Sequence, residues 1–91
     1  GTAEAMVLWA EFNGLAPGDI LRMSLTGPDG AEMASHSETM KGAKVRQFLF
    51  IGRKRTQPAW PKGDYAGRAS VERSSGIGAG TREIRYSFTV E

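Results

Sequence analysis

A run of basic residues in the middle of the chain is the segment best suited to bind a charged ligand. Arg53, Lys54 and Arg55 follow one another, and Trp60 and Lys62 come shortly after them. Exposed cations attract an anionic polymer over about 8 Å at physiological salt, and an indole ring offers a flat surface for stacking. These five residues form our candidate binding site for an anionic polymer. With one aromatic residue and no nucleic-acid-binding motif, we expect no nucleic acid as partner, and a solvated basic loop is the alternative.

Two methionines and the single histidine lie close together in the sequence. Met33, His36 and Met40 would offer two thioethers and an imidazole, ligands that suit cuprous ion. In an extended strand, however, residues 33 and 36 point to opposite faces, and methionine more often fills gaps in a hydrophobic core. We therefore expect no metal site and no cofactor, and keep a copper(I) site at these three residues as the alternative.

Residues that carry out catalysis are scarce. The chain has one histidine and no cysteine, so a zinc site would need carboxylates for nearly every ligand, and thiol chemistry is excluded. A serine triad would depend on His36, and the nucleophile-elbow motif is missing. The glycines at 76–80 lack the spacing and the following helix of a phosphate-binding loop, which favours a hairpin tip. We expect that the protein is not an enzyme.

Length and composition predict one small domain. Ninety-one residues, of which 40% are hydrophobic, are enough for a single core, and we assign residues 1–91 to one domain. The sequence does not begin with methionine, and we expect it to be a piece excised from a longer protein. It contains no apolar run near 18 residues and no signal-peptide pattern, which predicts no insertion into a membrane.

Charge is unevenly distributed along the chain. In residues 1–40 Arg22 stands against six acidic residues, and in residues 41–68 Asp64 stands against eight basic ones. Such a split is typical of a surface that binds a polyanion, and equally of oppositely charged strands that lie side by side. We favour the second interpretation for the chain as a whole.

The elements that must position these residues are short β-strands. Alternation of apolar and polar residues predicts strands over 6–12, 19–26, 31–39, 45–51, 65–72 and 81–90, each bounded by glycine or proline turns. Pro28 and Asp29 fit the centre of a type I turn, with Gly30 free to adopt a positive φ. This pattern predicts an all-β protein, an antiparallel immunoglobulin-like β-sandwich of six to seven strands, with a small closed barrel as the rival architecture.

The strands differ in where we expect them to lie. Both faces of 6–12 are mostly apolar, so it is expected to be central or covered, and 45–51 is expected inside a sheet. The polar segment 31–39 is expected at an edge. Trp60 is expected to close an end of the core, beside a turn at 61–64 that leads into the strand containing Tyr65. The expected core consists of Leu8, Leu21, Met23, Leu25, Phe48, Phe50, Trp60, Tyr65, Val71, Ile84, Tyr86 and Phe88.

Three stretches together resemble a known family. They are "LWAEFNGLAPGDILRMSLTGPDG" from Leu8, the Phe48–Lys54 segment with its Phe-x-Phe-x-Gly pattern, and "WPKGDYAGRASVER" from Trp60. They resemble the small β-rich, immunoglobulin-like accessory domain that accompanies some bacterial lysostaphin-like zinc murein endopeptidases. The catalytic zinc ligands of such peptidases have no counterpart here. The resemblance implies a periplasmic or cell-envelope location, a non-catalytic role, and the other domains of the parent protein as partners.

Two functions remain open at this point. The first is a non-catalytic accessory or binding module of a bacterial cell-envelope protein, attached to a peptidoglycan endopeptidase and contacting an anionic cell-wall polymer or its own catalytic neighbour. The second is an autonomous periplasmic carrier of copper or of a small ligand, built on Met33, His36 and Met40.

Overall fold

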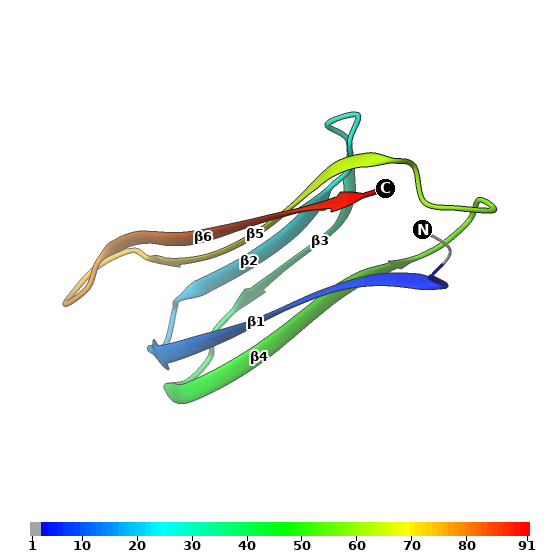
Figure 1. Ribbon diagram of the computed structural model, residues 1–91. Helices are drawn as coiled ribbons and strands as arrows, with labels where there is room; N and C mark the ends of the chain where they lie inside the picture. Colours follow the sequence, from blue (N-terminus) through cyan, green and yellow to red (C-terminus); the bar gives the residue numbers. More distant parts are fainter. Residues whose placement is uncertain (1–2) are drawn as a thin grey trace.

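The computed structural model describes residues 3–91 and shows an all-β protein (Figure 1). Its strands within that range are β1 (Ala5–Leu15), β2 (Ile20–Thr26), β3 (Glu32–Thr39), β4 (Lys44–Lys54), β5 (Gly63–Arg73) and β6 (Gly80–Val90). The six predicted strands are confirmed, and most extend a few residues beyond the predicted bounds because the backbone pairing continues past the apolar alternation.

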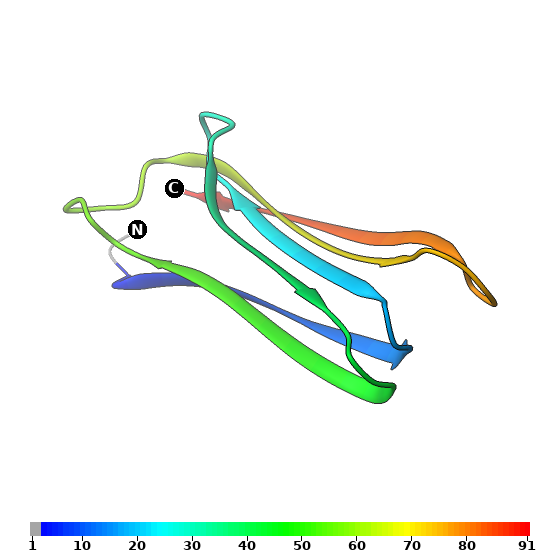
Figure 2. The same cartoon turned by 180° about the vertical axis from the view of Figure 1, so that it is seen from behind.

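The strands form two antiparallel sheets of unequal size. β1 pairs with β4 in a two-stranded sheet, and the other sheet has the order β3-β2-β5-β6. Figures 1 and 2 show these sheets as two separate layers, from the front and from behind. The predicted antiparallel sandwich is therefore confirmed, and the strands do not close into a barrel.

The two-stranded sheet covers only part of the larger one. β4 lies against β2 and β3, and β1 lies against β5, so that β6 extends beyond the small sheet. The molecule is elongated, with principal dimensions of 47 × 19 × 16 Å. The start of β1, the end of β6 and the β4–β5 loop gather at one end, whereas the β5–β6 hairpin projects at the other (Figure 1).

The core lies between the sheets where they overlap. Alternate residues of β2 are fully or almost fully buried, and they face apolar residues of β1 and β4; the buried cluster is Phe12, Leu15, Leu21, Met23, Leu25, Met40, Leu49 and Ile51. Burying one such side chain contributes about 1.5–3 kcal/mol. Gly67 allows β1 to approach β5 closely, since a Cβ there would lie 2.8 Å from Cδ2 of Leu8.

The structure corrects the expected core. Phe48, Phe50, Ile84 and Tyr86 were expected inside and are exposed, whereas Leu21, Met23, Leu25, Trp60 and Tyr65 are buried as expected. Leu8, Val71 and Phe88 are partly buried against the cluster. The error in β4 arises because alternation defines two faces without saying which one is covered. The larger aromatic residues lie on the outer face of β4, opposite Leu49 and Ile51.

Two strand placements are also wrong. Residues 45–51 were expected inside a sheet and residues 6–12 were expected to be central or covered, but β4 and β1 are both edge strands of the two-stranded sheet. Val7 and Trp9 on the outer face of β1 are exposed. The predicted edge position of 31–39 is confirmed, since β3 borders the four-stranded sheet.

The β2–β3 turn forms as its sequence predicts. Gly30 has a φ of 83° and its N–H donates to the carbonyl of Gly27 over 3.0 Å. Asp29 accepts a hydrogen bond from the N–H of Ala31 through its Oδ1, which is typical of aspartate in a tight turn. This turn lies at the same end of the sandwich as the basic segment.

Candidate functional site

A hollow of about 280 Å³ opens at the end of the sandwich where the β2–β3 turn meets the β4–β5 loop. Arg53 and Arg55 line it from the end of β4, Met33 lines it from β3, and Trp60 and Tyr65 line it from the start of β5. The chain brings them together because β4 and β5 run in opposite directions in different sheets and the connecting loop folds back across the end.

Three of the five predicted binding residues share this hollow. Arg53, Arg55 and Trp60 line it, whereas Lys54 and Lys62 do not. The alternation of β4 explains the difference at position 54, since its side chain points to the opposite face from its neighbour at 53. Arg53 donates from Nη1 to the carbonyl of Met33 over 3.3 Å, and the N–H of Arg55 donates to the carbonyl of Glu4 over 2.8 Å.

Trp60 has a structural role in the hollow. Its side chain is 7% exposed, and its Nε1–H donates to the carbonyl of Ala3 over 2.8 Å. An indole held in this way closes the end of the core, as predicted, and offers a ligand little of its ring. Of the predicted binding residues in the hollow, the two arginines are therefore better placed than Trp60 to contact a ligand.

Tyr65 fixes the turn that follows Trp60. Its hydroxyl donates to the carbonyl of Pro61 over 2.6 Å, and its ring stacks on Phe88 with centroids 5.3 Å apart. Burial, with the Asp29 carboxylate adding to it, raises the pKa of the Tyr65 hydroxyl, so the proton that makes this bond is retained. A tyrosine bonded to the backbone just upstream is also a feature of immunoglobulin-like sandwiches.

The charges around the hollow have both signs. Asp29 and Glu32 line it together with the two arginines. Their carboxylates reduce the positive potential that an approaching anion meets, since unlike charges within a few ångströms partly cancel. The site can attract an anionic polymer weakly, and salt should weaken that attraction further.

The three residues of the alternative copper site are separated. Met33 lies beside Gly27 at the end of β2, and the backbone of Met40 is bonded to that of Asp19 just before the start of β2. Six residues lie between them, and seven residue rises of extended chain place their Cα atoms roughly 23 Å apart. His36 lies exposed between them, opposite Met23 in the register. The part of the chain that the structure describes holds no group of three or more His, Asp or Glu residues suited to a metal ion.

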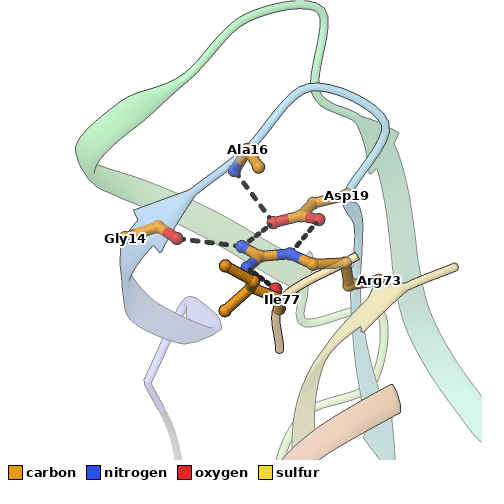
Figure 3. Close-up of polar contacts among 5 residues, drawn as sticks. All are labelled: Gly14, Ala16, Asp19, Arg73 and Ile77. Atoms are coloured by element: carbon orange, nitrogen blue, oxygen red, sulfur yellow. Dashed lines mark hydrogen bonds and ion pairs between the residues drawn. The ribbon is translucent and has the colours of Figure 1, made fainter. Parts of the chain in front are cut away.

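One buried ion pair was not predicted from the sequence (Figure 3). Asp19, at the end of the β1–β2 loop, is fully buried and receives two hydrogen bonds from Arg73, Nε to Oδ1 over 2.9 Å and Nη2 to Oδ2 over 2.8 Å. Arg73 also donates to the carbonyls of Gly14 and Ile77. We call this arrangement the Asp19–Arg73 clamp. It joins the β1–β2 loop to the end of β5 and to the β5–β6 hairpin.

The clamp is structural rather than catalytic. The hydrogen bonds from Arg73 and from the N–H of Ala16 lower the pKa of Asp19 to about 2, against the opposing effect of burial. A carboxylate with such a pKa is a poor general base at neutral pH. Nothing in the spacing could have indicated the pair, because 54 positions separate its members.

The second feature that the sequence analysis missed is apolar surface. Val7, Trp9, Phe48 and Phe50 are exposed on the small sheet, and Ile84 and Tyr86 are exposed on β6. The rings of Trp9 and Phe48 contact each other with centroids 6.2 Å apart. Alternation gives each of these strands two faces, but the number of strands that cover each face is not a local property of the sequence.

Comparisons with known proteins add no relative: no protein-family profile, curated protein or solved structure matches this chain. Over residues 3–91 the structure has no helix with the length and apolar character needed to span a membrane.

Proposed function

We propose that this chain is a non-catalytic binding module of a bacterial cell-envelope protein, carried beside a peptidoglycan endopeptidase, and that its arginine-lined end contacts an anionic cell-wall polymer. The periplasm or cell envelope is the location that this role requires. The observation that carries the proposal is the approach of Arg53 and Arg55 to one hollow at the end of the sandwich. Loops at the ends of such sandwiches commonly carry binding residues.

The resemblance of three sequence stretches to endopeptidase accessory domains supports the same role. In the structure these stretches supply the strands β1 and β2 with their turn, the end of β4, and the Trp60–Tyr65 corner. They contribute about half of the residues that line the hollow, among them Arg53, Trp60 and Tyr65. The copper-carrier alternative receives no such support, because Met33 and Met40 lie at opposite ends of β3.

The proposal is tested by co-sedimentation with purified peptidoglycan carrying its anionic polymers, at low salt and at about 0.15 M salt, where charges are screened beyond about 8 Å. We expect weak retention that falls steeply with salt. The double variant Arg53→Glu with Arg55→Glu should lose retention while it remains folded, with a change in melting temperature no larger than the loss of exposed contacts such as the Arg53–Met33 hydrogen bond produces.

A matched control separates the site from net charge. Lys41→Glu with Lys44→Glu changes the charge by the same amount at the opposite end of β4, in the β3–β4 loop and at the first residue of that strand. This control should bind as the wild type does. Equal losses in both double variants would show that net charge alone matters, and no retention of the wild type would favour a domain that only packs on its catalytic neighbour.

A further inference from the structure

The larger sheet exposes apolar side chains on its inner face. Ile84 and Tyr86 point to the same side of the sheet as buried Tyr65, to judge from their pairing with Ala69 and Gly67, yet they are 71% and 61% exposed. The cause is the width of the small sheet, which ends at β1 opposite β5 and leaves Ile84 and Tyr86 of β6 uncovered (Figures 1 and 2). One strand position beside β1 is vacant.

The vacant position is a groove rather than a flat surface. It has a volume of about 480 Å³, with Ile84 and Tyr86 along one side and the β1 residues 7–11 along the other. Gly67 and Ala69 form its floor. Leu8 already packs over Gly67, so a further side chain would enter the groove beside Leu8, against Ile84 and Tyr86.

β1 is also the sheet edge least protected against a new strand. Its eleven residues include one charge, Glu11, and no proline or lysine. The other three edge strands are more charged: β3 has Glu32 and Glu38, β4 has Lys44, Arg46, Arg53 and Lys54, and β6 has Arg82, Glu83 and Arg85. Proteins usually place charges and prolines on an exposed edge to prevent strand addition, and β1 lacks this protection.

The charged residues at the groove already have partners in the protein. Glu11 accepts from Arg46 over 2.8 Å, and Arg68 contacts Glu83 over 3.1 Å. The groove therefore complements a segment without charges. Its unpaired backbone groups lie along β1, and its apolar side chains lie along β6.

The second copy of this chain does not fit as occupant. If β1 paired with β1 of another copy in the antiparallel sense, the second β1 would lie opposite β6. The β5 strand that faces the second β1 would then need the space that β6 occupies, because in each copy β5 faces β1 and β6 continues the larger sheet past it. A single strand that brings no second sheet has no such conflict.

We propose that this groove binds one extended, uncharged segment of another polypeptide, which adds to β1 as a third strand and covers Ile84 and Tyr86. Main-chain hydrogen bonds to β1 would supply affinity, and every second side chain of the segment would enter the groove. This interaction is independent of the arginine-lined hollow and can hold whether or not the hollow binds cell-wall polymer.

The test uses a synthetic peptide of about nine residues, the length of a typical longer strand, that alternates threonine with valine or leucine. Binding should change the fluorescence of Trp9, which lines the groove and is exposed, while buried Trp60 remains a constant background. Backbone amides of β1 should gain protection from hydrogen exchange. A Trp9→Phe variant, in which the fluorescence change disappears and the protection remains, assigns the signal.

Two isoleucines provide a matched pair of variants. Ile84→Asp should weaken peptide binding by about tenfold or more, because an apolar contact is replaced by a charge. Ile77→Asp, at the hairpin tip where the side chain is 96% exposed, should leave binding unchanged. Equal binding by both variants, no protection of β1, or self-association that Ile84→Asp abolishes would each overturn the proposal.

Discussion

The carboxylate of Asp19 is fully buried, and its negative charge is balanced by a guanidinium that belongs to the far end of β5. A buried charge without its partner is costly, so removing either member of the Asp19–Arg73 clamp should destabilise the fold. The clamp also satisfies the carbonyls of Gly14 and Ile77, and in this way one arginine side chain orders two loops.

The clamp should make the stability of the protein depend on pH in the acid range. Folding lowers the pKa of Asp19 from 3.8 to about 2, so its contribution is complete above about pH 4 and is lost as the pH falls towards 2. Asp19→Asn should cost about 3 kcal/mol at pH 7 and should flatten this part of the pH profile. Urea denaturation between pH 7 and pH 2 measures both effects. A variant whose profile runs parallel to that of the wild type would contradict the assignment.

At the scale of the element, β4 shows how a strand acquires an inside and an outside. Phe12 pairs with Gln47 and Ala10 pairs with Leu49, so the inner row of β4 is set by its register with β1. The aromatic residues Phe48 and Phe50 then lie on the outer face, beside Trp9. The two-stranded sheet has a single neighbour, and only one of its faces can be covered.

Substitutions on the two faces of β4 should therefore differ in cost. Leu49→Ala, at a side chain that is 7% exposed, should destabilise the protein by about 2–5 kcal/mol. Phe50→Ala, at a side chain that is 65% exposed, should cost well under that amount although it removes more atoms. Thermal or urea unfolding of the two variants decides between the faces. A larger loss of stability for Phe50→Ala than for Leu49→Ala would mean that Phe48 and Phe50 face the core, as the sequence analysis expected.

At the scale of the whole molecule, the two ends of the sandwich are closed by different chemistry. The Asp19–Arg73 clamp holds the end with the β5–β6 hairpin. Trp60 and Tyr65 close the opposite end, where the indole bonds to the backbone before β1 and the phenol bonds to the turn before β5. Both closures involve segments that are distant in the sequence, as a molecule 47 Å long requires.

Loss of the indole should open the end that Trp60 closes. Trp60→Ala should lower the free energy of unfolding by about 3–5 kcal/mol, because a large buried side chain and its hydrogen bond are removed together. Trp9→Ala is the matched control, since that ring is 60% exposed, and it should change stability much less. Melting temperatures of the two variants give the comparison. An unchanged melting temperature for Trp60→Ala would mean that the indole does not stabilise the core, and would favour a role for Trp60 in ligand binding.

The sequence by itself determined the strands and turns of this protein. Alternation from Ile84 to Val90 or from Leu21 to Leu25 is a local property, and so is the turn chemistry of Pro28, Asp29 and Gly30. The basic segment could be identified in the same way, and part of it does line a hollow. The buried positions of Trp60 and Tyr65 followed from their size and from the turn between them.

Only the tertiary structure decided which faces are covered and which residues meet across the fold. The small sheet has two strands, so the outer face of β4 and the residues Ile84 and Tyr86 on the inner face of β6 stay exposed although their patterns predict burial. The clamp depends on a contact across 54 positions, which no local pattern records. Alternation describes a strand and its immediate neighbours, whereas coverage and long-range pairing depend on the number and order of strands, and these are set by the packing of the whole chain.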